Sequence, residues 1–249
     1  MKYDTIIFDM DGTLTESRGE MTPEHVELFE KLCSAFTVAV ISGADVGQMH
    51  AQIPFQYLWR KGVKPLYLMA LNGNVCLRNG EEKWRTALFW RDRMDILAHI
   101  AALRTEFPCD VTDERDLVED RAAQVSFSFI GHHAPRATKA EFDKKGILRS
   151  TALAKVPFTS ERIVVKVGGT TCLDYMPKDG TKAHNARKLF GEEGLQTALF
   201  VGDNLTPGGN DAVMVGVTDC VMVENPRATF HLIDRLLRGG VIPEIIPAA

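Results

Sequence analysis

The run Ile6-Ile7-Phe8-Asp9-Met10-Asp11-Gly12-Thr13 decides how the rest of this chain is interpreted. Its three apolar residues indicate the end of a buried strand, and an Asp-Gly turn closes the run. Side chains two positions apart in an extended segment point the same way, so Asp9 and Asp11 start on one face. They repel each other there unless a cation or a proton lies between them. We interpret this conflict as the mark of a site that binds Mg2+ and handles phosphate.

The composition is that of an ordinary folded protein, with 249 residues, 45% hydrophobic and 25% charged. A net charge of −4 makes nucleic acid an unexpected partner. The five cysteines form no Cys-x-x-Cys pair, which favours a reducing cytoplasm over a disulfide framework or a zinc cluster. No apolar run approaches the roughly 20 residues that span a bilayer, so no membrane partner is expected. We therefore expect a cytoplasmic globular protein.

The two ends of the chain predict one α/β domain with a doubly wound parallel sheet. Strand 5–9 leads to a helix that begins after Thr22, with Pro23 at its first position. Continuous apolar runs are typical of parallel strands covered on both faces, and they occur at 37–41, 66–70, 198–201 and 220–223. A further helix is predicted over 181–190.

The middle of the chain has a different pattern. A helix from about Trp90 to Phe107 would place Met94, Leu97, Ala101 and Leu103 on one side. Residues 124–130 alternate between apolar and polar, as in an antiparallel strand with one wet face. A helical stretch near 138–155 and strands at 162–167 and 171–175 complete an α+β module. We predict a discontinuous core, 1–83 and 180–249, with this module inserted at 84–179.

Three buried strands end in polar residues, namely Asp9 and Asp11, Ser42 and Gly43, and Asp203 and Asn204. Ligands of open parallel sheets bind beyond the carboxyl ends of the strands, so these residues should converge. Carboxylate and hydroxyl oxygens suit Mg2+ together with a substrate phosphate. Lys182 lies in the first turn of a helix, where the dipole disfavours a cation, which hints that an anion joins it.

This set resembles the haloacid-dehalogenase (HAD) superfamily of phosphotransferases, whose core is Rossmann-like. The resemblance rests on DxDGT at 9–13, Ser42, Lys182 and GDxxxxGGND at 202–211, in that order. An insert between the second and third of these motifs is similar to the subgroup with the larger α/β cap, class IIB. Within this subgroup, two segments most resemble the eukaryotic-type phosphomannomutases and their bacterial relatives. They are Thr15-Glu16-Ser17-Arg18 and Gly208-Gly209-Asn210-Asp211.

The resemblance implies a mechanism. Asp9 would attack phosphorus to form an aspartyl-phosphate, and Asp11 would act as general acid and then base. Ser42, Gly43 and Lys182 would hold the phosphoryl oxygens. Mg2+ would be held by Asp9, the Asp11 carbonyl and Asp203, with Asn204 and Asp211 orienting the metal and the lysine.

The cap residues of the resembling family decide between two reactions. Arg18, Arg121 and Asp174 match substrate residues of the phosphomannomutases. The second cap arginine of that family falls at His132, an asparagine at Ser126, a serine at Cys172, and a third arginine near Lys139. Histidine does not replace a bidentate arginine toward phosphate. We therefore expect a phosphatase of small phosphosugars, with a phosphohexomutase that interconverts hexose 1- and 6-phosphates as the alternative.

Two non-enzymatic interpretations are weaker. Counted from Asp9, a calcium-binding loop would need glycine at its sixth place, which holds Leu14, and a strand precedes it. A phosphosugar sensor on the same fold would not need every core motif intact. The resemblance also allows a homodimer through the cap, although no exposed apolar stripe is evident in the sequence.

Overall fold

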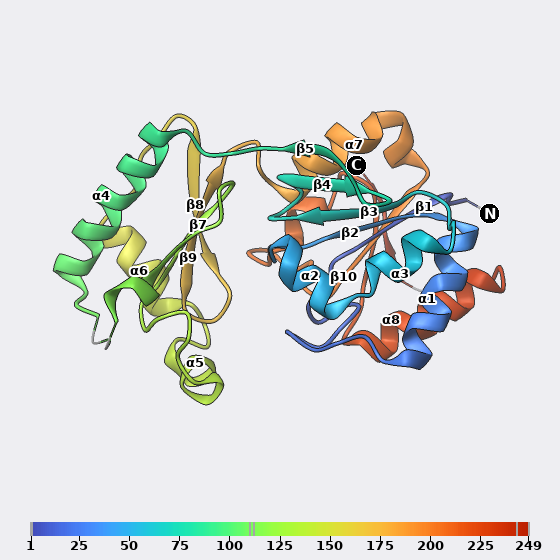
Figure 1. Cartoon of the computed structure of the whole chain (residues 1–249), viewed down its shortest axis with the longest axis horizontal. Coiled ribbons are helices and arrows are strands. Elements are labelled where there is room, and N and C mark those ends of the chain that lie inside the picture. The colour runs from blue at the N-terminus through green and yellow to red at the C-terminus, as the bar shows by residue number, and fades with distance from the viewer. Residues whose placement is uncertain (1, 110, 112, 243, 249) are drawn as a thin grey trace. The chain divides into compact units, whose positions relative to one another are not determined.

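The computed structural model describes residues 2–109, 111, 113–242 and 244–248, and it divides into two compact units (Figure 1). The core unit consists of Met1–Arg85 and Gly180–Ala249. The inserted unit is Thr86–Asp179.

An eight-stranded sheet forms the centre of the core unit, in the order β12-β11-β10-β1-β2-β3-β4-β5. The five strands from β11 to β3 run parallel, and antiparallel strands flank them on both sides. This topology confirms the predicted α/β class. The strands are β1 (Thr5–Phe8), β2 (Thr37–Ile41), β3 (Leu66–Ala70), β4 (Val75–Arg78), β5 (Glu81–Arg85), β10 (Ala198–Gly202), β11 (Asp219–Met222) and β12 (Ile245–Ile246).

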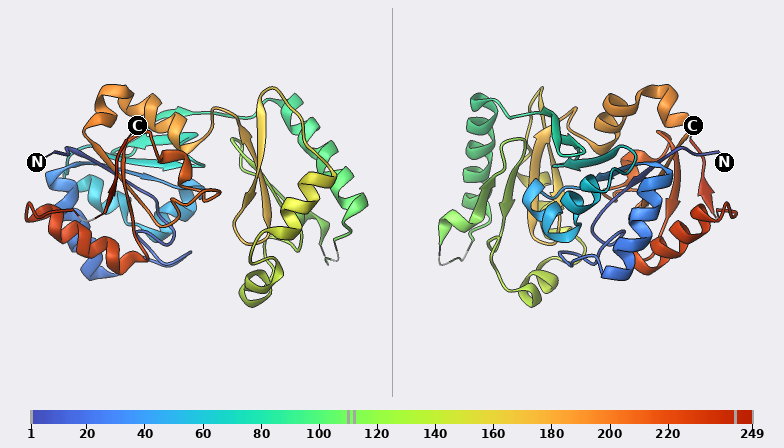
Figure 2. Two further views of the ribbon diagram at one scale, coloured as in Figure 1. Left: turned by 180° about the vertical axis from the view of Figure 1, so that it is seen from behind. Right: turned by 45° about the vertical axis from the view of Figure 1, so that its right-hand side comes forward.

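Helices cover both faces of this sheet, which is why its central strands are apolar on both sides. The helix α7 and the short 3-10 helix lie on one face, and α1, α2, α3 and α8 lie on the other (Figures 1 and 2). Every residue of β1 and β10 is buried. The helices are α1 (Pro23–Ala35), α2 (Val46–Gln52), α3 (Phe55–Arg60), α7 (Lys182–Gln196) and α8 (Pro226–Leu237), with a short 3-10 helix at Ala212–Met214.

The start of α1 is as predicted, because the Thr22 side chain accepts a hydrogen bond from the His25 amide and Pro23 is the first helical residue. The helix predicted over 181–190 continues to Gln196, through a non-helical Gly191. Among the described residues, no helix is long and apolar enough to cross a membrane.

The inserted unit is a four-stranded antiparallel sheet in the order β6-β7-β9-β8, with α4 and α6 on one side of it (Figure 1). Alternate residues of β7 and β9, among them Phe127 and Tyr175, are buried in its hydrophobic core. The elements are α4 (Trp90–Glu106), a 3-10 helix (Glu114–Leu117), β6 (Val118–Asp120), β7 (Val125–Ser128), α5 (Arg136–Phe142), α6 (Ile147–Lys155), β8 (Ile163–Gly168) and β9 (Cys172–Pro177).

Three expectations for this unit were wrong. The polar residues of the strand expected to have a wet face, Gln124, Ser126 and Ser128, are buried. The helical stretch near 138–155 is two helices, α5 and α6, separated by a turn in which Gly146 has a φ of 65°. The buried face of α4 carries Ile96, Ile100 and Leu103, whereas Met94 and Leu97 are exposed. With Trp90, they form an exposed apolar stripe on α4, contrary to the expectation that no such stripe exists.

Candidate active site

The carboxyl ends of three neighbouring strands bring the predicted core residues together. Strand β1 lies between β2 and β10, and all three run parallel. Asp9 follows β1, Ser42 follows β2, and Asp203 follows β10 directly. Polar side chains far apart in the sequence therefore meet at one edge of the sheet, as the strand-end argument predicts.

Lys182 ties this edge to α7. Its Nζ donates hydrogen bonds to Asp9 Oδ1 at 2.5 Å and to Asp211 Oδ1 at 2.7 Å. All three residues are buried, with at most 3% of their surface exposed. Burial alone would lower the pKa of Lys182, but the carboxylates of Asp9 and Asp211 outweigh burial and raise it. The ammonium is therefore held charged inside the protein.

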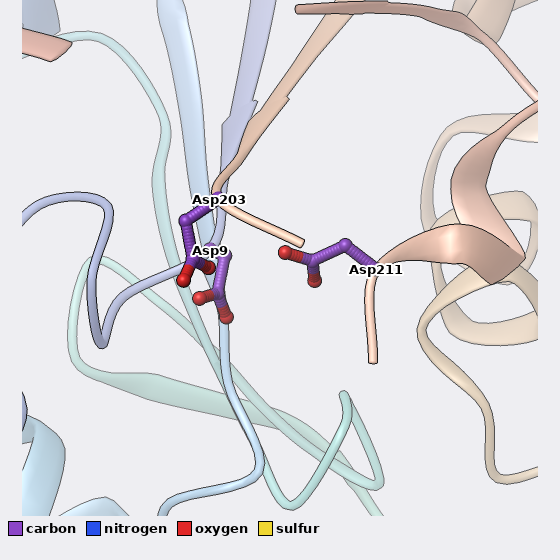
Figure 3. Close-up of side chains that lie close together, drawn as sticks. All are labelled: Asp9, Asp203 and Asp211. Atoms are coloured by element: carbon purple, nitrogen blue, oxygen red, sulfur yellow. The ribbon is translucent and has the colours of Figure 1, made fainter. Parts of the chain in front are cut away.

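Three carboxylates converge around this point, from Asp9, Asp203 and Asp211 (Figure 3). One oxygen of each lies within 4.8 Å of the others. Burial, and then the neighbouring Asp211 carboxylate, raises the pKa of Asp203. Burial likewise raises the pKa of Asp9, although Lys182 opposes this effect. Asp9 and Asp211 are buried with one ammonium, and the partly exposed Asp203 lies beside them, so the cluster has an excess of negative charge that is costly to bury.

The donor set fits a hard divalent cation. The Asp211 Oδ2 atom is buried and has no hydrogen-bond partner among the described residues. Carboxylate oxygens without nitrogen or sulfur ligands are what Mg2+ prefers. Such an ion would offset the excess charge of the cluster.

Asp11 is placed differently from Asp9. It is partly exposed, and its Oδ1 accepts a hydrogen bond from the Arg18 amide at 2.9 Å. Gly12, which follows Asp11, has a φ of 82°. A Cβ at this position would lie 2.6 Å from Asp203 Oδ2. The Asp-Gly turn is thus required for Asp203 to approach the β1 loop. The exposed Arg18 reaches Asp11 through its backbone.

The remaining core residues surround this cluster. The buried Ser42 Oγ accepts a hydrogen bond from the Ala44 amide at 3.1 Å, which folds the chain tightly around Gly43. Asn204 is exposed, and its carbonyl accepts a hydrogen bond from the Asp211 amide at 3.2 Å. The backbone of Asn204 therefore fixes the position of Asp211.

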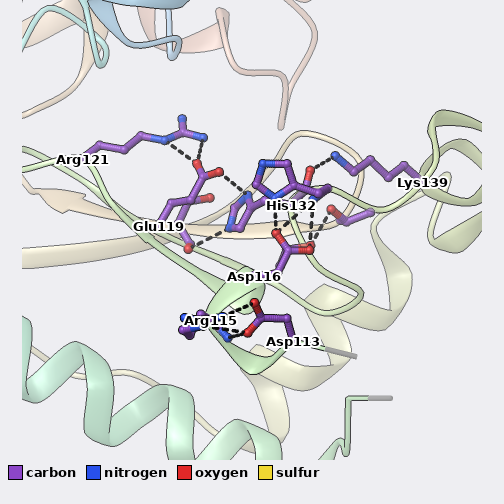
Figure 4. Close-up of polar contacts among 11 residues, drawn as sticks. Asp113, Arg115, Asp116, Glu119, Arg121, His132 and Lys139 are labelled. Atoms are coloured by element: carbon purple, nitrogen blue, oxygen red, sulfur yellow. Dashed lines mark hydrogen bonds and ion pairs between the residues drawn. The ribbon is translucent and has the colours of Figure 1, made fainter. Parts of the chain in front are cut away.

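The two substrate candidates of the inserted unit are already paired within that unit. Arg121 donates from Nε and Nη2 to Glu119 Oε2 at 3.0 and 2.5 Å (Figure 4). Asp174 Oδ1 accepts from the Ser126 hydroxyl at 2.6 Å. Burial raises the pKa of Asp174. Neighbouring strands β7 and β9 place Ser126 directly opposite Asp174.

His132 lies in the same group of polar side chains. It is buried, its Nε2 lies 3.2 Å from the Ser126 carbonyl, and its Nδ1 lies 3.6 Å from Glu119 Oε1. Lys139 donates to the His132 carbonyl (Figure 4). Burial would lower the pKa of His132, but contacts with Cys172 and Glu119 raise it overall.

Two residues of the core edge were missed from the sequence, Asn72 and Asn185. The Asn185 side chain donates to the Asn72 carbonyl at 2.8 Å, beside the Ser42 segment. The Asn72-Gly73 dipeptide was visible as the end of an apolar run, but only as a turn signal.

The sequence is similar to proteins of a known family. A protein-family model described as "Eukaryotic phosphomannomutase" matches residues 25–238, most of the chain. The chain belongs to this family. A phosphomannomutase from Encephalitozoon cuniculi is 26% identical over 247 residues, which cover 93% of each chain. A phosphomannomutase from Dendrobium officinale is 27% identical over 220 residues, covering 83% of this chain and 82% of the relative.

Solved structures show that the fold of this phosphomannomutase-family chain is the HAD fold, as the motifs predicted. An IMP-bound, N-terminally truncated IMP-nucleotidase from Plasmodium falciparum superimposes with a TM-score of 0.64 at 13% identity, over 95% of this chain and 68% of the other. The trehalose-6-phosphate phosphatase of Aspergillus fumigatus gives a TM-score of 0.58 at 16% identity, over 95% and 93%. At these identities the likeness concerns the fold alone.

Proposed function

We propose that this protein is a Mg2+-dependent phosphotransferase that acts on small phosphosugars through an aspartyl-phosphate on Asp9. The observation that carries the proposal is the buried Lys182, which bridges Asp9 and Asp211 beside the Asp203 carboxylate. A buried cluster with excess negative charge costs stability, and a site that receives a cation and a phosphoryl group explains why it is kept.

The first half-reaction transfers the phosphoryl group to the protein. An Asp9 carboxylate oxygen attacks phosphorus, and the bond between phosphorus and the sugar oxygen breaks. Asp11 donates its proton to the departing sugar oxygen. The Arg18 amide holds the Asp11 carboxyl on the loop after β1 while this proton moves. Ser42, the Gly43 amide and Lys182 hold the phosphoryl oxygens.

The second half-reaction returns Asp9 to its starting state. Asp11, now a carboxylate, takes a proton from the incoming hydroxyl or water, whose oxygen attacks phosphorus. The bond between phosphorus and Asp9 then breaks. Water as acceptor yields inorganic phosphate, and a sugar hydroxyl yields a rearranged sugar phosphate.

Asp9, the Asp11 carbonyl and Asp203 would hold Mg2+, and Asp211 and Asn204 would orient this set. The bound ion supplies electrostatic stabilisation of the charge on the transferring phosphoryl group. Lys182, whose ammonium contacts Asp9, would contribute the same kind of stabilisation.

The inserted unit favours water as the acceptor, and therefore a phosphatase. A mutase has to grip the phosphate that is not being transferred, and paired arginines do this best. Here His132 occupies the position of the second cap arginine and faces Glu119. The Arg121 guanidinium is also engaged by Glu119. The acids around these cations weaken any site for a second phosphate dianion.

Membership in the eukaryotic phosphomannomutase family favours the second candidate, a phosphohexomutase. The curated relatives named above are phosphomannomutases. A mutase would keep the same phosphoaspartate and pass its phosphoryl group to the other end of a hexose phosphate.

One assay separates the two reactions. The chain is incubated with hexose 1-phosphates and Mg2+, with and without a hexose bisphosphate. We expect inorganic phosphate release that needs no bisphosphate and disappears when EDTA removes the metal. Bisphosphate-dependent formation of hexose 6-phosphate would establish the mutase instead. Binding of the sugar phosphate without either product, unchanged in Asp9→Asn, would indicate a sensor and contradict the proposal.

We also infer a homodimer through the inserted unit. The exposed apolar stripe on α4, Trp90, Met94 and Leu97, follows i, i+4, i+7 spacing on one helix face. Trp90 is 74% and Met94 is 55% exposed. Apolar groups gathered in this way favour burial against another helix.

A further inference from the structure

The hairpin tip Leu71–Asn74, between β3 and β4, contacts both segments that would hold the phosphoryl group. On one side, the Asn72 amide donates to the Ser42 carbonyl at 2.7 Å, and the Leu71 amide donates to the Ala44 carbonyl at 2.9 Å. These bonds bracket Gly43. The hairpin tip therefore holds the chain that turns around Gly43.

On its other side, the hairpin tip contacts the start of α7, the helix that carries Lys182. The Asn185 side chain donates to the Asn72 carbonyl at 2.8 Å. The Asn74 side chain donates to the Gly180 carbonyl at 2.9 Å. Both amide side chains are buried, with 1–2% of their surface exposed. The tip thus connects the Ser42 segment to the Lys182 helix.

The backbone of the hairpin tip has an unfavourable conformation. Leu71, Asn72 and Gly73 have φ values of 51°, 60° and 87°, and the Gly73 amide closes the turn on the Ala70 carbonyl at 2.9 Å. A turn with two central residues of positive φ prefers Asn-Gly at those two places. Here Leu71 and Asn72 occupy them instead, although a left-handed leucine is unfavourable.

The close approach of α7 explains this register. A Cβ at Gly73 would lie 2.6 Å from the Asn185 Cβ, so glycine is required after the turn centre rather than within it. The same register brings the Asn72 side chain to Gly43, with its Oδ1 3.9 Å from where a Gly43 Cβ would be. The strain is retained because the alternative register would move Asn72 away from Gly43.

We propose that Asn72 is a positioning residue for phosphoryl transfer, which rests on the proposed function. It sets the Ser42-Gly43 donors relative to the Lys182 helix, and its amide lies against Gly43. Asn72→Gly keeps the backbone hydrogen bonds to Ser42 and Asn185 and removes the side-chain amide beside Gly43, so it tests the side chain. We expect its loss to slow transfer more than it weakens folding.

The test compares Asn72→Gly with Asn79→Gly. Both asparagines have positive φ and precede a glycine, and Asn79 lies in the next hairpin turn, between β4 and β5. We expect Asn72→Gly to lower kcat by about tenfold to a hundredfold with a smaller change in KM, a range typical of residues that orient a site. Inhibition by orthovanadate should weaken to a similar extent. Asn79→Gly should keep parental kcat and orthovanadate inhibition.

Asn185→Leu provides an independent variant, because it removes the donor to the Asn72 carbonyl without changing Asn72. It should reproduce the fall in kcat. Parental kcat and orthovanadate inhibition in both Asn72→Gly and Asn185→Leu would overturn the proposal while leaving the proposed function intact. Absence of Mg2+-dependent turnover in the parent protein would instead contradict the proposed function.

Discussion

At the scale of single residues, Asp9 carries a conflict between stability and chemistry. It is buried beside Asp211, and the conflict is only partly offset by the Lys182 ammonium. A neutral side chain of the same shape would relieve the cost of burying a charge. The residue on which the proposed reaction depends thus carries a charge that is costly to bury.

Asp9→Asn should separate these two properties. We expect turnover to fall by roughly four to six orders of magnitude, as when a nucleophile is removed. The midpoint of thermal unfolding, measured without metal, should be at least as high as that of the parent, because a buried charge has been removed. Asp4→Asn, a change of the same chemistry near the start of β1, serves as control and should keep activity. A lower midpoint together with lost turnover would contradict this account.

The sequence predicted the acidic residues of this site and Asn204, but not Asn72 and Asn185. The proximity of Asp9 and Asp203 could be predicted because the ends of parallel strands meet at one edge of a sheet, independently of the loop conformations. Asn72 acts through a turn register that depends on how closely Asn185 approaches Gly73. A distance of that kind is not encoded in periodicity.

At the scale of elements, the face of α4 that packs on the sheet of its unit includes a buried histidine, His99. His99 Nε2 lies 2.8 Å from the Val156 carbonyl, so it carries the proton, and Nδ1 accepts from the Tyr175 hydroxyl at 2.7 Å. The bond that Nδ1 accepts from Tyr175 requires a neutral ring, because a protonated Nδ1 can only donate. Burial lowers the pKa of His99 accordingly.

The stability of the inserted unit should therefore depend on pH. Below the ordinary histidine pKa of about 6.5, His99 is protonated in the unfolded chain but stays neutral in the folded protein. The free energy of unfolding should fall from pH 7.5 toward pH 5.5, by up to about 1.4 kcal/mol per pH unit from this residue. Urea denaturation of the parent and of His99→Gln tests this, since glutamine keeps both a donor and an acceptor. Equal pH slopes in the two proteins would refute the role of His99.

Elements bounded by clear breakers were predicted best. Strands β1, β2 and β3 are continuous apolar runs that end at polar residues or glycine, and α1 has a Thr-Pro start. The edge strand β5 reads Glu-Glu-Lys-Trp-Arg, and it has no apolar pattern because four of its five residues are exposed. The buried face of α4 was misread because the helix is apolar on two faces, and periodicity alone does not say which one packs.

At the scale of the whole molecule, the exposed stripe on α4 predicts how copies associate. Met94→Glu should convert a dimer into a monomer, because it places a charge in the middle of the stripe. Light scattering coupled to size-exclusion chromatography measures this directly. Ile147→Glu on α6 is the matched control, since Ile147 is also exposed and apolar, and it should leave the dimer intact. A parent protein that is monomeric at micromolar concentration would refute the dimer.

The split of the core unit into two chain segments affects how the protein is made on the ribosome. Strand β1 emerges before its neighbour β10, and the entire inserted unit separates the two in the chain. Residues 86–179 form their own sheet and hydrophobic core, so they have what they need to fold while synthesis continues. The first segment has to wait with an unpaired strand edge until Ala198–Gly202 arrives. The nascent chain thus has an unpaired strand edge, open to mispairing, for the time that more than a hundred residues take to be translated, about 5–20 s at typical rates.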